Sequence, residues 1–108
     1  MESEMSIDEK LSLQRLLSGR VRLPQHVVFR AFPAETVVLN LDTGKYHSLN
    51  PSGGRFLEVL EQARSGQDGL GRLQEEFPDQ DPAELQADLH KFCIDLADRG
   101  LIEVEGGS

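Results

Sequence analysis

Three histidines and one cysteine are the residues of this chain best suited to metal binding or nucleophilic catalysis. His26 and His47 stand apart, whereas His90 and Cys93 lie three positions apart in a stretch with helical periodicity, where both could bind one metal ion. A structural zinc site needs four ligands, and no second pair accompanies these two. No Ser/His/Asp or Cys/His set stands out by its spacing. We therefore expect no catalysis, metal or cofactor, and we expect Cys93 to be a small buried apolar residue.

Charge and composition narrow the class of protein further. The 108 residues allow one hydrophobic core, and 19 acidic against 11 basic side chains give a net charge of −8. The negative electrostatic potential of such a chain repels nucleic acids and acidic membrane surfaces. No apolar run approaches the roughly 20 residues that span a bilayer, and the acidic residues 1–5 do not resemble a signal peptide. A single cysteine suits a reducing compartment, so we expect a cytoplasmic protein without a membrane or nucleic-acid partner.

The N-terminal part is expected to form a helix. Ser6 and Glu9 have the spacing of a capping box, in which hydroxyl and carboxylate bind each other's backbone amides. Leucines at helical spacing follow, and Gly19 can end the helix. This pattern predicts an extra helix over residues 6–18 and a connector over residues 20–24, where Pro24 disfavours helix before it. Residues 1–22 are thus predicted as an extension, residues 23–105 as the main domain and residues 106–108 as a tail.

The main domain begins with three predicted strands. Residues 26–32 and 35–41 are rich in β-branched and aromatic residues, and residues 45–49 form the third such run. Turn residues separate them, Pro33-Ala34 first and Asp42-Thr43-Gly44 second. Because the connections are short, we expect an antiparallel meander. Three strands with one apolar face need helices to cover them.

Three helices are predicted after the strands. Asn50 can cap the first, Pro51 suits its first position, and the helix is expected to reach Arg64. Residues 65–68 are expected to interrupt the helical structure, and a weaker helix is expected over residues 69–77. Asp81 caps the third helix, which continues to residue 98 or 99. Residues 101–104 can add a short last strand, so we predict an α+β fold: three antiparallel strands followed by three helices.

Two faces of the third predicted helix are apolar. At 100° per residue, Leu85, Leu89, Phe92 and Leu96 form one narrow stripe that we expect to face the core. Asp88, Asp95 and Arg99 flank this stripe on one side. Nearly opposite lies a weaker apolar stripe that includes Ile94, which is either an isolated exposed residue or a contact for a partner.

The third predicted strand carries the feature that points to a function. It runs directly from Gly44 through Tyr46 and Leu49 into the helix that starts at Pro51. A strand that ends so abruptly has little room for another hairpin strand beside it and can therefore lie at a sheet edge. An exposed edge is a docking site for an extended peptide. It also allows a weak homodimer by edge pairing.

Residues 37–53, followed by an apolar helix, resemble the PqqD family, and so does the ending Leu96-Ala97-Asp98-Arg99-Gly100-Leu101-Ile102. The similarity covers roughly residues 24–105. Tyr46-His47-Ser48-Leu49-Asn50-Pro51 is similar to the small stand-alone members found in lasso-peptide gene clusters. The resemblance implies a winged helix-turn-helix fold and a RiPP recognition element, a domain that binds the leader of a ribosomally made precursor peptide as an added strand.

Transferred to this sequence, the resemblance implies that the leader pairs with residues 45–49 and lies against the helix over residues 81–98. It implies a non-catalytic adaptor that presents the leader, most similar to a lasso-peptide leader, to a leader protease and other maturation enzymes. The implied peptide-binding residues are Lys45, Tyr46, His47, Ser48, Leu49, Leu85, Asp88, Leu89, Cys93 and Ile94. The alternative is a winged-helix transcriptional regulator that binds DNA, for which the acidic third helix has the wrong charge.

Overall fold

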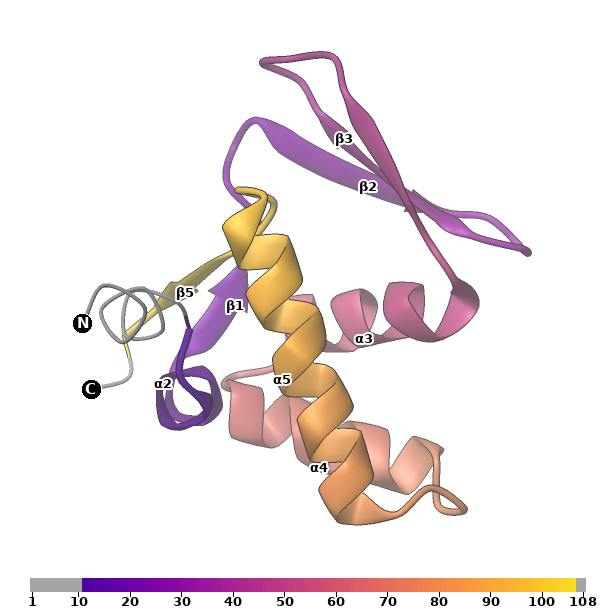
Figure 1. Cartoon of the computed structure of the whole chain (residues 1–108), viewed down its shortest axis with the longest axis vertical. Coiled ribbons are helices and arrows are strands. Elements are labelled where there is room, and N and C mark those ends of the chain that lie inside the picture. Colours follow the sequence, from indigo (N-terminus) through magenta and orange to yellow (C-terminus); the bar gives the residue numbers. More distant parts are fainter. Residues whose placement is uncertain (1–10, 107–108) are drawn as a thin grey trace, which may run out of the picture.

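The computed structural model describes residues 11–106 and contains two small antiparallel sheets and four helices in that range (Figure 1). The α+β class predicted from the sequence is confirmed. In chain order the elements are α2 (Leu13–Ser18), β1 (Arg20–Arg22), β2 (Val27–Ala31), β3 (Thr36–Asn40), β4 (Tyr46–Leu49), α3 (Pro51–Gln62), α4 (Gly66–Glu76), α5 (Pro82–Asp98) and β5 (Glu103–Glu105).

The three-stranded sheet is an antiparallel meander with the order β2-β3-β4, as the short connections predict. At the β3–β4 turn, the side chain of Asn40 accepts hydrogen bonds from the backbone N–H groups of Asp42 and Thr43. Gly44 adopts φ 75°, a left-handed conformation that a residue without Cβ tolerates well. The meander leaves β4 at one edge of the sheet and β2 at the other.

Alternation along the strands separates an inner from an outer face of this sheet. On the inner face Val27, Thr36 and Val38 are buried against the helices. The outer face is exposed and still apolar, with Val28 45% and Tyr46 72% exposed. One face of the sheet therefore belongs to the core and the other is free.

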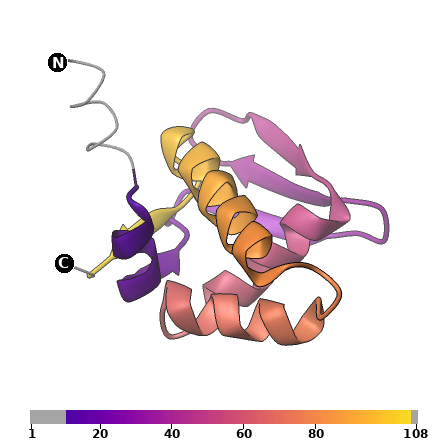
Figure 2. The same ribbon diagram turned by 60° about the horizontal axis from the view of Figure 1, so that its bottom comes forward.

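Polar caps fix where α3 and α5 begin. Asn50 accepts a hydrogen bond of 2.7 Å from the N–H of Gly53, with Pro51 at the first turn of α3. Asp81 accepts one of 3.1 Å from the N–H of Glu84 at the start of α5. Both predicted caps are confirmed. α5 runs across the middle of the molecule, with the three-stranded sheet near its C-terminal end and α4 near its N-terminal end (Figures 1 and 2).

The start of α4 differs from the prediction. We expected a break over residues 65–68, but the helix begins at Gly66, because Ser65 acts as its N-cap and accepts a hydrogen bond from the N–H of Asp68. Gly66 lets the helix approach α2 closely, since an added Cβ would lie 2.0 Å from the carbonyl oxygen of Leu16. The glycine that lowers helix propensity is therefore needed for packing.

The predicted connector over residues 20–24 is also wrong in its first half. β1 pairs with β5, Val21 opposite Val104, and forms a second, two-stranded sheet. This sheet lies beside α2 on one side of α5 (Figures 1 and 2). Leu16 of α2 and Val21 of β1 are 0% and 1% exposed, so the extension contributes to the same core as the main domain.

The predicted helix over residues 6–18 begins later in the described part of the chain. Leu11 and Ser12 are not helical, and Ser12 caps α2 by accepting a hydrogen bond from the N–H of Arg15. Gly19 ends α2, as predicted. The capping box expected at Ser6 and Glu9 lies outside the described residues.

Candidate functional site

The free edge of β4 presents the backbone groups of two residues to a ligand. In an antiparallel pair, successive residues alternate between hydrogen-bonded and non-hydrogen-bonded positions. The N–H of Asn40 donates to the carbonyl oxygen of Lys45 at 2.8 Å, which fixes this alternation for β3 and β4. His47 and Leu49 therefore bond to β3, whereas the N–H and C=O groups of Tyr46 and Ser48 point outward from the sheet.

The side chains of β4 divide in the same alternating way. Those of His47 and Leu49 are half-buried and face the helices, opposite the buried Val38 and Thr36 of β3. Tyr46 and Ser48 are exposed on the outer face, where the hydroxyl of Ser48 donates to the carboxylate of Glu35. A peptide strand at this edge would therefore direct alternate side chains toward α5.

One side of α5 lies along this edge. Arg99 contacts the ring of His47, with 3.2 Å between Nη1 and Nδ1, and donates from Nε to Asp95 at 3.2 Å. Phe92 and Asp88 are nearer the N-terminus on the same side, because residues three and four apart share a helix face. The contact with His47 settles which flank of the core stripe faces β4, a choice that the helical pattern left open.

A hollow of about 400 Å³ continues the edge beyond the end of β4. Three aromatic rings meet at it in edge-to-face contacts, with centroid distances of 6.5 Å from Phe56 to Phe77 and 5.5 Å from Phe56 to Phe92. Such contacts add to the stability of the apolar wall. The residues that line the hollow are Asn50, Ser52, Gly53, Phe56, Phe77, Gln80, Asp88 and Phe92.

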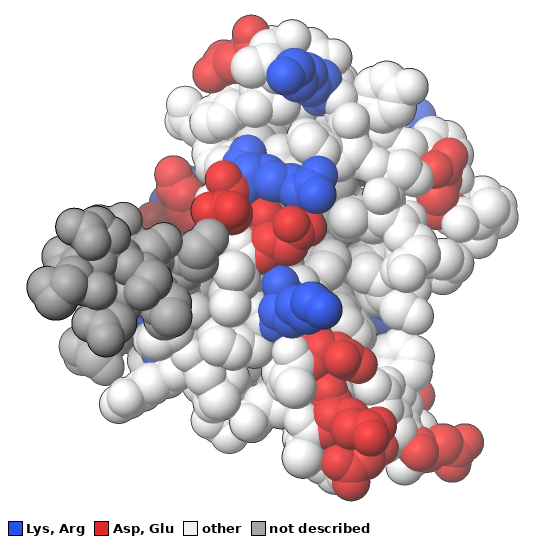
Figure 3. Space-filling model, in the orientation of Figure 1, with Lys and Arg blue, Asp and Glu red and all other residues white. Residues whose placement is uncertain are grey.

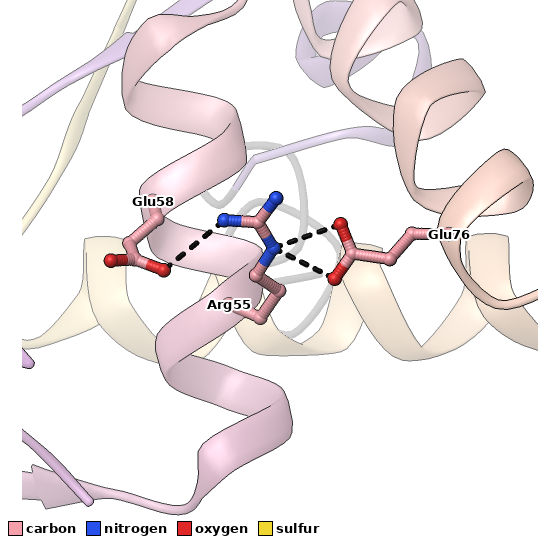
Figure 4. Close-up of polar contacts among 3 residues, drawn as sticks. All are labelled: Arg55, Glu58 and Glu76. Carbon is pink, nitrogen blue, oxygen red and sulfur yellow. Dashed lines mark hydrogen bonds and ion pairs between the residues drawn. The ribbon is translucent and has the colours of Figure 1, made fainter. Parts of the chain in front are cut away.

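An ion pair between α3 and α4 lies beside the hollow. Arg55 of α3 donates from Nε to both carboxylate oxygens of Glu76, at 2.8 and 2.7 Å, and from Nη1 to Glu58 at 3.3 Å (Figure 4). The hydrogen bond to Glu76 is the main reason that the pKa of Arg55 is raised. Because Glu76 precedes Phe77, this pair links the end of α4 to α3 beside the hollow.

Three of the predicted contact residues are buried in the core. Leu85, Leu89 and Cys93 are 0%, 1% and 0% exposed, and they offer no surface to a peptide. Burial away from water raises the pKa of the Cys93 thiol to about 12. Their burial removes them from the set of peptide-contacting side chains that we propose below.

Ile94 lies on a different side of α5 from Asp88, Phe92 and Arg99, which border a cleft together with the β4 edge and the hollow. It is half-buried against the core and is one turn after His90, whose Nε2 is 2.8 Å from the carbonyl oxygen of Leu11. Leu11 thus contacts α5 on that face. Lys45, Tyr46, His47, Ser48 and Leu49 lie together at the edge, with Asp88 farther along the cleft.

Sequence reasoning missed the aromatic part of the site. The spacing of Phe92 predicts that it faces the core, but Phe92 and Phe77 are only half-buried and line the hollow together with Phe56. Gln80 and Arg99 were not predicted as site residues either. The one available signal was that Asp88, Phe92, Asp95 and Arg99 recur at spacings of three and four, which places them on one side of a helix.

The opposite edge of the sheet and its outer face form a second free surface. The N–H of Phe32 donates to the carbonyl oxygen of Glu35 at 2.7 Å, so Phe32 is a hydrogen-bonded position of the β2–β3 pair. By the same alternation, the backbone groups of Phe29 and Ala31 point away from β3. A hollow of about 460 Å³ lies on the outer face, lined by Val28, Phe29, Arg30, Phe32, Val37 and Leu39.

Within residues 11–106, no group of three or more His, Cys, Asp or Glu side chains could hold a metal ion. No helix in the same range is both long and apolar enough to cross a bilayer.

The fold and the free edge beside α5 define a class of small domains that can receive an extended segment, and comparisons with known proteins identify the family. The family described as coenzyme PQQ synthesis protein D (PqqD) matches residues 35–102. This is well over half of the chain, and the chain belongs to the PqqD family. A comparison with curated proteins gives no match.

Two solved structures share the fold. One is described as TbiB1 in complex with the TbiA(beta) leader peptide; it is 28% identical, with a TM-score of 0.68, and the alignment covers 81% of this chain and 98% of the other. The second, described as lasso peptide synthetase B1 complexed with the leader peptide, is 19% identical, with a TM-score of 0.69 and coverage of 78% and 98%. Together with the family match, the first structure identifies the chain as a PqqD-like RiPP recognition element.

Proposed function

We propose that this chain binds the leader segment of a ribosomally made precursor peptide, of the lasso class, as a fourth strand on β4. The observation that carries the proposal is the outward direction of the backbone groups of Tyr46 and Ser48, derived from the register of β3 and β4. An added strand satisfies such groups and gives a docked peptide its direction and register. The family and the leader-bound relative are consistent with this role.

The backbone contribution can be estimated from these two residues. Each offers one donor and one acceptor, so that a leader strand gains about four hydrogen bonds of about 0.5–1.5 kcal/mol each. Their sum of about 2–6 kcal/mol is less than the roughly 8 kcal/mol of a micromolar complex. The difference has to come from leader side chains, for which we propose the inner face formed by His47, Leu49 and Phe92 and the hollow beyond it.

We further propose that the chain is a non-catalytic adaptor that presents the bound leader to a leader protease and other maturation enzymes. A domain that holds the leader raises its local concentration at an enzyme without contributing a catalytic residue. The exposed apolar outer face, with Phe32 50% exposed, supports docking of a protein partner beside the leader.

We also propose a winged helix-turn-helix arrangement, a cytoplasmic location, domain boundaries at residues 22 and 105, and a weak homodimer, for which the free edge of β2 leaves room. Against the DNA-binding alternative stands the charge of α5, where acidic side chains cover the N-terminal end in Figure 3. A phosphate-binding surface has the opposite sign.

A pair of proline variants at the two sheet edges tests strand addition. Ser48→Pro removes an N–H that points away from the sheet at β4, and Ala31→Pro removes one that points away at β2. A fluorescently labelled leader peptide from the same biosynthetic cluster is titrated with each variant after circular dichroism has established that it is folded. We expect Ser48→Pro to weaken binding about fivefold or more and Ala31→Pro to leave the Kd unchanged.

Equal affinity of folded Ser48→Pro and the unmodified chain would contradict strand addition at β4. Loss of binding in Ala31→Pro alone would move the site to β2. Binding of duplex DNA in place of the leader would favour the regulator.

A further inference from the structure

The relative direction of β4 and α5 follows from three observations along the cleft. His47 contacts Arg99, near the C-terminus of α5. An added Cβ at Gly53 would lie 3.2 Å from Phe92 and 3.6 Å from Leu49, which places these two side chains beside the same glycine. Asn50, the residue after β4, lines the same hollow as Asp88. As β4 advances, it therefore passes α5 from its C-terminal toward its N-terminal end.

The N-terminal end of this cleft is acidic. Asp88 lies at the hollow, where Gln80 donates to its Oδ2 at 3.0 Å, and within the described part of the chain it makes no ion pair. Acidic side chains gather at this end of α5, and a basic side chain borders them on the side toward the C-terminus of the helix (Figure 3). Aromatic rings and a carboxylate suit a long side chain with an apolar stem and a cationic tip, that is, lysine or arginine.

The side chain of Arg99 places a positive charge at the C-terminal end of the cleft. Arg99 uses Nε for Asp95 and Nη1 for His47, and a guanidinium has five N–H donors in all. The ion pair with Asp95 is exposed, with side chains 51% and 57% accessible, and such pairs contribute little. A carboxylate on a ligand can therefore bind the remaining donors in a bidentate arrangement.

The distance between the two charges translates into a spacing in an extended peptide. Arg99 follows Asp88 by eleven residues, which corresponds to about 16 Å along a helix. An antiparallel strand covers that distance in about five residues. Because two side chains that both face α5 are separated by an even number of positions, the spacing is about four or six residues.

We propose that this cleft reads the order of charges in the leader: a basic residue at Asp88, and an acidic residue about four or six positions later at Arg99. The order follows from antiparallel addition to β4, the arrangement of the whole sheet, since such a peptide runs parallel to α5. The inference rests on the proposed function and adds to it a substrate class, a leader segment with its cation before its anion.

Selection from a random library of displayed peptides tests this inference without a known leader. The library is selected on the full chain and on four variants, and the enriched sequences are aligned. Asp88→Asn and Arg99→Gln each remove one charge of the cleft. Arg72→Gln is the matched control for Arg99, because Arg72 makes the same kind of i,i+4 pair with Asp68 at 3.2 Å on α4. Ser48→Pro disrupts pairing at the β4 edge, so peptides enriched on this variant measure the background binding that does not use that edge.

We expect the unmodified chain to enrich peptides in which lysine or arginine precedes aspartate or glutamate by about four or six residues. Asp88→Asn should reduce the basic preference, and Arg99→Gln the acidic preference, about threefold or more, while Arg72→Gln changes neither. Enriched peptides without this order, or with preferences that both variants leave intact, would overturn the inference and leave strand addition standing. No enrichment over Ser48→Pro would overturn the proposed function as well.

Discussion

Replacement of Gly54 by alanine tests how α3 is placed under the sheet that carries the candidate edge. Gly54 is within α3, and a Cβ at this position would lie 2.1 Å from Oγ1 and 2.8 Å from Cβ of Thr36, a buried residue of β3. Contacts this short force either the helix or the strand to move. Overpacking of this kind costs about 1–3 kcal/mol, and it opposes a gain of up to about 1 kcal/mol from the better helix propensity of alanine.

We therefore expect Gly54→Ala to lower the free energy of unfolding by about 1–2 kcal/mol net, measured by urea denaturation. In a domain of this size that corresponds to a fall in Tm of about 4–8 °C for each kcal/mol. Gly71→Ala is the matched control, since Gly71 is also inside a helix but a Cβ there meets nothing within 4 Å. The control should raise stability by about 0.5–1 kcal/mol.

The two glycine variants separate packing from propensity. If Gly54→Ala is as stabilising as Gly71→Ala, α3 does not approach Thr36 as described, and the position of β4 next to α3 is in doubt. If Gly71→Ala is also destabilising, the backbone at Gly71 differs from the helical conformation of α4.

Three further results are expected. The Cys93 thiol, whose pKa burial raises to about 12, should not react with an aromatic disulfide reagent at pH 8 in the folded protein and should react fully in urea; rapid reaction in the folded state would contradict its burial. A hydrogen bond from the N–H of Arg64 lowers the pKa of Asp68 from its ordinary value of 3.8, so Asp68 stabilises the fold above that pH and less as the pH falls through its folded pKa; the difference in Tm between the unmodified chain and Asp68→Asn should shrink in acid, and a constant difference would refute this. Phe32→Ser should leave leader binding intact and slow leader cleavage by the protease of the same cluster; unchanged cleavage would remove the outer face as its docking surface.

The sequence predicts best what depends on neighbouring residues. The caps at Asn50 and Asp81 and the turn at Gly44 use local hydrogen bonds or local backbone freedom, and each is found where the residue types indicate. The meander also follows from local information, because its connections are short.

Features that need distant partners could not be predicted in the same way. β1 has three residues, and its partner β5 is at the other end of the chain, so no periodicity identifies it. Ser65 and Gly66 are typical of a break, and only contact with α2 explains why a helix begins there.

The candidate site combines both kinds of information. Abrupt passage from strand to helix at Leu49 and Asn50 indicated the β4 edge. Periodicity also separated the core stripe of α5 from its flanks, but it carries no information on which flank meets β4. That choice depends on the contact between His47 and Arg99, and the aromatic hollow depends on how three helices meet.

Amide hydrogen exchange of the isotope-labelled chain, with and without a saturating leader peptide, tests the central claim most directly. Strand addition at β4 gives the N–H groups of Tyr46 and Ser48 new acceptors, and we expect their exchange to slow about tenfold or more, while Phe29 and Ala31 on the β2 edge exchange as before. Unchanged exchange at Tyr46 and Ser48 in the saturated complex, or protection at Phe29 and Ala31 instead, would contradict it.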